Sequence, residues 1–336
     1  MKWFVALISC ILLTLTANYA FAQSWKTGKL TFRSNDIIDN RRVESWYMMN
    51  ADGNDLKKLT ECTINDGKIS KWYWGGVLSP DCKKVAFNLS NYDIIMGKGI
   101  SYDVAVLDID TGKIKNLTNN KKDDHCYLPY WSPDAKKIVF KRMFSPDYMS
   151  EICIMNSDGS NIRKIGVGEG YPLDWSTDGL KIVFAQNKGN IYTVYTMDIN
   201  GEDVKVIVDG IEFVTDLRYS PDGKQIAFNV QPNGNGNRVY IMDSNGNNLK
   251  LLIELKGNFC CWSPDGKKLA MVTRIEPDTT FHIFIIDTEG GVLERLTNND
   301  RQEGLVDWRD PALFHAGVEP LSTSSIVTWG YIKAQK

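Results

Sequence analysis

The stretch Trp262-Ser-Pro-Asp-Gly-Lys-Lys-Leu-Ala-Met271 has related copies along the whole chain. The first residue of each copy, called the lead residue here, is aromatic with one exception; the leads are Leu78, Trp131, Trp175, Tyr219, Trp262 and, in a degenerate copy, Trp308. Successive leads are 53, 44, 44, 43 and 46 residues apart. Because a self-similar period in the mid-forties is typical of propellers and solenoids, the spacing predicts a repeat fold.

One repeat unit carries the signals for four short strands. Strand-like segments rich in β-branched and aromatic residues occupy 128–132, 137–140, 151–155 and 162–165. Between the first two lies a Ser-Pro-Asp turn, in which Pro presets the backbone angle and Asp accepts hydrogen bonds from nearby amides. Asn156-Ser-Asp-Gly159 is a hairpin signal between the last two. Four antiparallel strands per unit form a propeller blade.

The two ends of the chain are out of phase with the repeat. Lys29-Leu-Thr-Phe32 matches a second strand, whereas Leu305-Val-Asp-Trp308 matches a first strand that has no blade of its own. Pairing the two segments closes the ring and removes its open sheet edges. We therefore predict an all-β, six-bladed β-propeller of four-stranded antiparallel blades over residues 23–311, in which the C-terminal strand completes the N-terminal blade. We expect residues 312–336 to form a tail packed on the propeller.

The N-terminal residues have the pattern of an export signal. A positive start at Met1-Lys2 precedes the apolar run from Phe4 to Leu15, and Ala20-Phe-Ala22 offers small residues at a cleavage spacing. The apolar run is too short for a good membrane span. We predict a signal peptide over 1–22 with cleavage near Ala22, and a periplasmic or secreted product.

Composition and cysteine content exclude several classes of function. The chain of 336 residues has 43% hydrophobic and 24% charged residues with a net charge of -2, so no basic excess would attract nucleic acid or anionic lipid. The cysteines after the signal are even in number, which permits disulfides, but their irregular spacing favours free thiols; they are Cys62, Cys82, Cys126, Cys153, Cys260 and Cys261. The absence of Cys-x-x-Cys removes the common zinc and redox motifs, and we expect no cofactor.

The repeat resembles that of a known family. Copies that run aromatic-Ser-Pro-Asp-Gly-Lys-x-Ile-Ala-Phe, followed by a Met-Asp-x-x-Gly turn and Leu-Thr, are similar to the repeats of TolB-type periplasmic propellers, and also to the propellers of prolyl oligopeptidase-like peptidases. The resemblance covers about residues 25–311 and implies the propeller fold more specifically than any function. Two departures matter. We expect neither the N-terminal domain of TolB nor the hydrolase domain of the peptidases, and no Gly-x-Ser-x-Gly nucleophile motif occurs.

We place the candidate binding site on the irregular face of the ring. The Ser-Pro-Asp turns and the Asp-Gly turns are short and alike, so the face that they share is expected to be scaffold. The loops on the opposite face differ in length and chemistry, and such loops commonly carry binding residues. The candidates are Lys71, Trp72, Tyr73, Asp123, Asp124, His125, Tyr127, Glu169, Tyr171, Arg301 and Glu303.

The chemistry of these candidates favours an interface over an active site. Asp123, Asp124 and His125 could bind a metal, and His125 could act as a base, but a solvated charged loop explains the stretch better. A metal site needs three or more convergent ligands, and His282 and His315 are the other histidines. We assign no metal site and no catalytic residue. Aromatic residues at 72–74 suit a peptide or sugar partner, or else they pack between blades.

The sequence leaves two functions open. The first is an exported, non-catalytic protein-interaction module, either an adaptor or a cofactor-free subunit of a larger periplasmic complex, for example one that contains redox or haem groups. Its partners would be proteins or peptides, such as the other subunits. The alternative is a propeller enzyme, a lyase or glycoside hydrolase, with its site in the channel mouth. The repeat alone cannot decide, because unrelated functions are grafted onto one scaffold.

Overall fold

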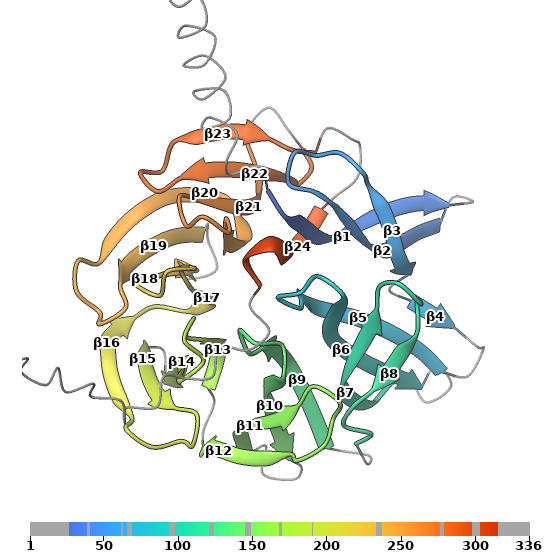
Figure 1. The fold of residues 1–336 in the computed structure, drawn as a ribbon, viewed down its shortest axis with the longest axis horizontal. Helices are drawn as coiled ribbons and strands as arrows, with labels where there is room; N and C mark the ends of the chain where they lie inside the picture. Colours follow the sequence, from blue (N-terminus) through green and yellow to red (C-terminus); the bar gives the residue numbers. More distant parts are fainter. Residues whose placement is uncertain are drawn as a thin grey trace, which may run out of the picture.

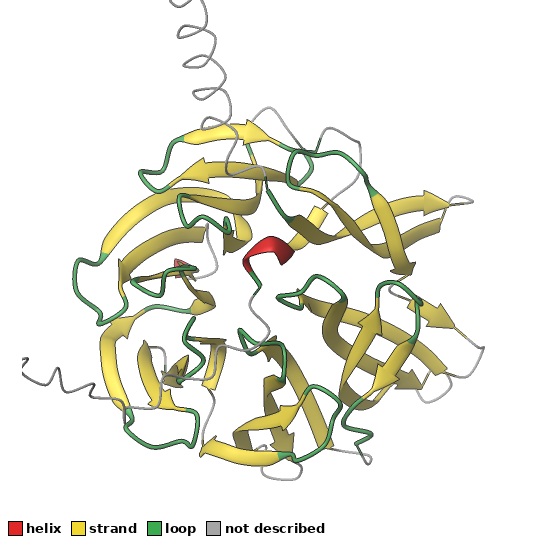
Figure 2. Ribbon diagram, viewed as in Figure 1, coloured by secondary structure: helices red, strands yellow, loops and turns green. Residues whose placement is uncertain are grey.

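Short antiparallel strands build nearly all of the regular structure. The computed structural model describes residues 27–314 apart from 39–40, 62, 66–68, 94–97, 121–123, 145–148, 168–169, 190, 233–236, 276–278 and 298–302. In this part of the chain the sheets lie around a common centre (Figure 1), and the short 3-10 helix η2 (Pro311–Leu313) lies near that centre (Figure 2). The predicted all-β propeller of four-stranded antiparallel sheets is confirmed. No helix within these residues is long and apolar enough to cross a membrane.

The two ends of the propeller meet in one sheet. Its order is β24 (Glu303–Arg309), β1 (Lys29–Ile38), β2 (Arg41–Asn50) and β3 (Lys57–Glu61). β24 runs antiparallel to β1, with Trp308 opposite Leu30 and Asp307 opposite Thr31. The C-terminal strand therefore completes the N-terminal sheet, as the out-of-phase ends predict, and it covers the edge of β1.

A second, larger sheet joins two repeat units. The first unit contains β4 (Thr63–Asn65), β5 (Ile69–Leu78), β6 (Lys84–Asp93), β7 (Lys98–Asp108) and β8 (Ile114–Asn116). The second contains β9 (Asp124–Trp131), β10 (Lys137–Phe144), β11 (Met149–Asn156) and β12 (Arg163–Val167). The two units are linked where β7 and β9 share one parallel pair, Tyr102 opposite His125.

The remaining strands form two further sheets. One is four-stranded, with β13 (Gly170–Trp175), β14 (Lys181–Lys188), β15 (Ile191–Asp198) and β16 (Lys205–Ile211). The other contains β17 (Val214–Tyr219), β18 (Gln225–Val230), β19 (Asn237–Asp243), β20 (Lys250–Trp262), β21 (Lys268–Arg274), β22 (His282–Asp287) and β23 (Val292–Arg295). β20 has 13 residues and pairs with β19 through its first half and with β21 through its second. Because two of the sheets each run through two repeat units, the number of six blades stays a prediction from the repeat.

The Ser-Pro-Asp turns are held by one hydrogen-bond pattern. In the turn after Trp131, the Ser132 hydroxyl donates to Asp134 Oδ1 at 2.6 Å and accepts from the amide of Lys137 at 2.8 Å. The amide of Lys136 donates to the same Asp134 oxygen at 3.0 Å. The Ser–Asp bond recurs at 2.5–2.7 Å in the other four turns, which begin at Ser79, Ser176, Ser220 and Ser263. The residue after Asp takes a positive φ, which is why Gly is common there; in this turn it is Ala135, at 57°.

Three tryptophan lead residues connect their units to the one before. The indole nitrogens of Trp131 and Trp175 donate to the carbonyls of Val77 and Tyr130, both at 3.1 Å. Trp262 donates in the same way to a carbonyl on β17 at 3.2 Å. A buried Trp needs such a partner, and the ring supplies one at the neighbouring unit. In these three contacts the donor and the acceptor are about one repeat apart in the sequence.

Cys82, Cys126 and Cys153 are free thiols. Cys126 lies opposite Arg142 of β10, and Cys153 lies opposite Phe140 of the same strand. The two cysteines are thus two strand spacings apart, or about 9–10 Å, which is beyond the reach of a disulfide. Burial raises the pKa of Cys126 to about 12 and that of Cys153 to about 11.

One predicted feature falls differently in the structure, and two others stay predictions. The stretch 119–130, expected to be a loop up to Leu128, becomes strand β9 from Asp124 onward, because β9 stays paired with β10 out to Asp124 opposite Phe144. The predicted signal peptide and residues 315–336 of the predicted tail lie outside the described residues.

Candidate binding site at the centre of the ring

The predicted residues on β5 are partly buried in the core. Tyr73 is only 4% exposed, and its ring packs against Phe87 with the centroids 5.0 Å apart. Lys71 and Trp72 lie on the same strand, but their side chains are outside the described residues. Tyr73 therefore contributes to packing, which was the alternative considered for the aromatic residues of this stretch.

The described candidates on β9 are half-buried and lie on the two faces of the strand, Asp124 on one and His125 and Tyr127 on the other. Asp124 pairs with Arg142 Nη2 at 3.1 Å. The ring of His125 meets the ring of Tyr102 edge-on at 5.0 Å. Tyr127 donates its hydroxyl to the sulfur of Met143 at 3.2 Å. The structure thus brings Asp124, His125 and Tyr127 together on one strand, and no group of three metal-ligating side chains was found among the described residues.

Of the remaining candidates, Glu303 is described in full. Its Oε2 lies 3.1 Å from His282 Nδ1 and accepts the hydroxyl of Thr297 at 3.0 Å. Both side chains are almost fully buried. Asp123, Glu169 and Arg301 lie outside the described residues, and Tyr171 is described only as part of the backbone of β13. Glu303 is therefore a buried structural residue and does not line an exposed mouth.

A cavity of about 290 Å³ lies at the centre of the ring, on the face of the regular turns. Its rim contains the Pro or Thr of each Ser-Pro-Asp turn, together with aromatic leads. The residues that line it are Pro80, Trp131, Pro133, Asp174, Trp175, Thr177, Arg218, Tyr219, Pro221, Cys261, Trp262, Pro264, Asp307, Trp308, Arg309, Asp310, Leu313 and Phe314. This face was expected to be scaffold, and the sequence reasoning missed these residues.

Arg218 is held on the wall of the cavity by three neighbours. Its Nη1 lies 3.0 Å from Asp216 Oδ1 and donates to the carbonyl of Leu217 at 3.1 Å. The guanidinium also lies over the ring of Tyr130, 4.4 Å from the centroid, in a cation–π contact. Burial alone would lower the pKa of Arg218, but Asp216 and the other acidic neighbours outweigh it and raise that pKa. The guanidinium is therefore a permanent positive charge.

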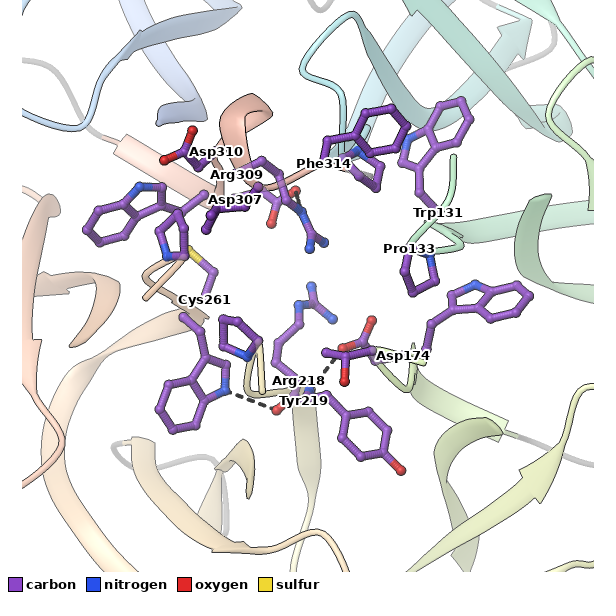
Figure 3. A pocket seen from close by; sticks show the side chains of 18 residues that line it. Trp131, Pro133, Asp174, Arg218, Tyr219, Cys261, Asp307, Arg309, Asp310 and Phe314 are labelled. Atoms are coloured by element: carbon purple, nitrogen blue, oxygen red, sulfur yellow. Dashed lines mark hydrogen bonds and ion pairs between the residues drawn. The ribbon is translucent and has the colours of Figure 1, made fainter. Parts of the chain in front are cut away.

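Arg309 approaches from the closing strand. Its Nε lies 3.4 Å from Asp307 Oδ2, and a third of its side chain is exposed. Burial again opposes the charge, yet Asp307 and Asp174 raise the pKa of Arg309. Figure 3 shows the guanidinium groups of Arg218 and Arg309 pointing toward one another into the middle of the cavity.

The acidic residues of the cavity wall hold neighbouring units together. Asp307 Oδ2 accepts the amide of Leu78 at 2.8 Å, and Asp174 Oδ2 accepts the amide of Tyr219 at 3.0 Å. Each carboxylate thus binds the lead residue of the next unit. Burial raises the pKa of Asp174, even though the two arginines act against that shift. The carboxylates of Asp174 and Asp307 are thus bound to the backbone of the cavity wall, whereas the guanidinium groups of Arg218 and Arg309 extend into the cavity.

A positional signal in the sequence could have identified this site. Asp174, Arg218 and Asp307 all occupy the position before a lead residue, where the other copies carry Val77, Tyr130 and Cys261. Arg309 stands where the other copies have the turn serine. A comparison of the repeats by what differs, instead of by what they share, would have pointed to the centre of the ring.

The fold and this site define a β-propeller with a polar cavity at its centre. The chain belongs to the family described as TolB beta propeller domain, which matches residues 77–258.

Curated relatives cover only part of the chain. A stretch of 171 residues is 28% identical to an uncharacterized protein of Agrobacterium fabrum and spans 46% of this chain and 54% of that protein. Another of 136 residues is 29% identical to the Tol-Pal system protein TolB of Francisella tularensis, over 40% of this chain and 31% of that protein. The matches therefore span about half, or less than a third, of the relatives' own lengths.

Solved structures share the fold at low identity. TolB from Acinetobacter baumannii superposes with a TM-score of 0.68 at 20% identity, covering 84% of this chain and 67% of that chain. Hydrazine synthase from Kuenenia stuttgartiensis gives a TM-score of 0.62 at 11% identity, over 84% of this chain and 46% of that one. At such identities the likeness concerns the fold alone.

Proposed function

We propose that this chain is an exported, non-catalytic interaction module that holds a protein or peptide partner at the centre of its ring. It would act as an adaptor or as a cofactor-free subunit of a larger periplasmic complex, for example one with redox or haem groups. The observation that carries the proposal is the central cavity, where two arginines converge inside a rim of Pro and Trp side chains.

The composition of the cavity supports a protein partner. Binding hot spots are rich in Trp, Tyr and Arg and lie in concave, well-packed places. Here Trp131, Trp175 and Trp262 have their indole nitrogens satisfied within the ring, so their rings are fixed in place before any partner arrives. Side chains that are already ordered lose little entropy on binding, which favours affinity.

The relatives are compatible with this role. The Francisella protein is named as part of the Tol-Pal system, so a propeller of this family serves in a multi-protein system there. In hydrazine synthase a propeller of this fold is part of a longer enzyme chain. Both support the adaptor or subunit role for the present chain.

The irregular face could provide a second contact region. Asp124, His125 and Tyr127 lie together on β9 with Tyr102 beside them. Exposed edges of these half-buried side chains would suit a polar rim around a partner, in the way that interface rims are built. We keep Lys71, Trp72, Asp123, Glu169, Tyr171 and Arg301 as candidates for the same rim.

Isolation from the native exported fraction tests the module. The tagged chain should co-purify with a partner in fixed stoichiometry that survives moderate salt, and its mature N-terminus should be Gln23. Arg309→Gln should release the partner. Arg238→Gln, which removes the pair with Glu254 and the contact with Tyr240 away from the central cavity, should retain it. A chain that purifies alone and cleaves polysaccharide would overturn the proposal in favour of a propeller enzyme.

A further inference from the structure

The guanidinium groups of Arg218 and Arg309 face one another across the central cavity without a carboxylate between them (Figure 3). Arg218 uses Nη1 for Asp216 and for the carbonyl of Leu217. The ion pair of Arg309 with Asp307 runs through Nε. A guanidinium has five N–H donors, so each arginine still has donors that face the cavity. Four aspartates, Asp174, Asp216, Asp307 and Asp310, surround the two arginines, so an anion in this space would be held by the hydrogen bonds of the guanidinium groups and not by a net positive charge.

The carboxylates of Asp174 and Asp307 in the cavity wall indicate which kind of anion fits between the arginines. Asp174 and Asp307 already accept backbone amides from neighbouring units, so they stay on the wall when a ligand enters. Their negative charge repels a dianion more than a monoanion. A guanidinium fork matches a carboxylate with two parallel hydrogen bonds. A single carboxylate would therefore complete an alternating row of charges from Asp174 through Arg218 and Arg309 to Asp307.

The size and rim of the cavity indicate what accompanies the carboxylate. A volume of about 290 Å³ is at or just below the lower limit of small-molecule sites, roughly 300–1,000 Å³, so it suits one side chain or one chain end. The rim offers flat apolar surfaces from Pro133, Pro221 and Pro264, and from Leu313, which is 56% exposed. An apolar or aromatic group next to the carboxylate would cover these surfaces.

We propose that the central cavity binds a carboxylate between Arg218 and Arg309, presented by a partner polypeptide beside an apolar residue. This inference rests on the proposed interaction function and names the chemistry that the site recognises. Acidic side chains and free C-termini both carry such a group, and the two sources are separated by the probes below.

Four short peptides test the proposal on the unmodified chain. The first ends in phenylalanine with a free carboxylate, and the second is the same peptide as its C-terminal amide. The third has an internal Phe-Glu with both ends blocked, and the fourth replaces that Glu with Lys. Titration calorimetry should show binding of the first or the third, which identifies the source, and at least about tenfold weaker binding of the amide and of the Lys peptide. The proposal is overturned if neither acidic peptide binds more tightly than its matched control, the amide for the first and the Lys peptide for the third.

Variants then locate the carboxylate. Arg309→Gln should weaken the acidic peptide by about tenfold or more, and Arg309→Lys should recover only part of the loss, because an ammonium cannot form the two parallel bonds. Arg238→Gln is the matched control on the outside of the ring and should bind as the unmodified chain does. An unchanged affinity in a folded Arg309→Gln chain contradicts the assignment.

Chemical labelling provides a test that needs no variant, in case Arg309→Gln weakens the closing strand. Phenylglyoxal modifies accessible guanidinium groups, and mass spectrometry reports each site. The acidic peptide should protect Arg309 from modification, whereas its amide should not. Labelling of Arg309 that is indifferent to the acidic peptide overturns the proposal.

The two levels of the proposal fail in different ways. If a stoichiometric partner stays bound while saturating acidic peptide fails to compete with it, the carboxylate inference is wrong and the interaction module stands. If the acidic peptide binds through Arg309 while the exported chain has no partner and cleaves polysaccharide, the carboxylate site stands and the interaction module is wrong.

Discussion

Two junctions between neighbouring units each contain a threonine at the same position of the repeat, Thr118 and Thr297, but the two threonines have different partners. At the inner junction, Thr118 Oγ1 accepts the amide of Val104 at 3.1 Å and donates to Asp103 at 2.9 Å. At the closing junction, Thr297 Oγ1 accepts the amide of Ile283 at 3.0 Å and donates to a carboxylate oxygen of Glu303, also at 3.0 Å. Both threonines belong to the Leu-Thr of the repeat.

The difference lies in where the carboxylate comes from. Asp103 belongs to the same unit as Thr118 and also accepts the amide of Asn120 at 2.7 Å. Glu303 belongs to the closing strand β24 and lies against His282. The carboxylate of the inner junction thus comes from within the unit of Thr118, whereas that of the closing junction comes from β24, the strand that pairs with β1.

The largest expected effect comes from removing the closing strand. Deletion of 305–311 takes away Asp307 and Trp308 and leaves the edge of β1 without its partner. We expect the single cooperative unfolding transition in urea to be lost. Circular dichroism and tryptophan fluorescence would both be used to measure the transition. The inner junction should keep part of the structure, so the two probes should separate. An unchanged transition would show that closure is unimportant for stability.

The next largest effect compares the contributions of Glu303 and Asp103 to stability. Glu303→Gln removes the charge that faces His282 in a fully buried place, and we expect a loss of about 3 kcal/mol in the free energy of unfolding. Asp103→Asn keeps one oxygen that can accept from Thr118 and Asn120 and loses the one that accepts from Ser101, and we expect a loss of about 1–2 kcal/mol. Urea midpoints of the two variants measure the difference. Equal losses would mean that the source of the carboxylate does not matter.

A smaller and matched effect isolates the threonines. Thr118→Val and Thr297→Val each keep the shape of the side chain but leave a buried backbone amide without its acceptor. We expect each to lose about 1–3 kcal/mol of unfolding free energy, with similar values for both. A much larger loss at Thr297 would mean that the Thr297 hydroxyl, and not Glu303, makes the closing junction contribute more to stability than the inner one.

The last effect is absent at neutral pH and develops only at alkaline pH, and it involves a thiol at each junction. Burial raises the pKa of Cys126, near the inner junction, to about 12, and burial followed by the charge of Asp307 raises that of Cys82, near the closing strand, to about 12. The unfolded thiols ionise near 9, so the native state binds more protons above that pH. Stability should therefore fall between about pH 9 and 12. Cys82→Ala and Cys126→Ala should each flatten this slope in thermal unfolding, and an unaltered slope would exclude the thiol concerned.

The fold could be predicted because its determinants recur. The Ser132–Asp134 turn and the Trp131 contact with Val77 depend on residues a few positions apart or one period apart, and each is repeated around the ring. The mismatch of Lys29–Phe32 and Leu305–Trp308 with the period was enough to predict the closing strand. Each of these features lies in what the copies share.

The site could not be predicted in the same way. Arg218 and Arg309 belong to different copies and meet only because the ring brings their strands to one centre, and a spacing in sequence does not contain that distance. Glu303 looked like a polar residue at a mouth, but the burial that it shares with His282 comes from the neighbouring strand. Tyr73 shows the same limit, since the pattern could not choose between exposure and the core.

The continuous strand β20 makes the stiffness of the ring uneven. Its 13 residues pass from β19 to β21 without a break, so the segment 214–295 bends as one plate. Between β7 and β9 the connection is one parallel residue pair, which gives a compliant seam. Arg218 would therefore move together with this segment when the ring deforms, whereas the described junctions without a strand pair, such as that between β12 and β13, would open before the seam between β7 and β9.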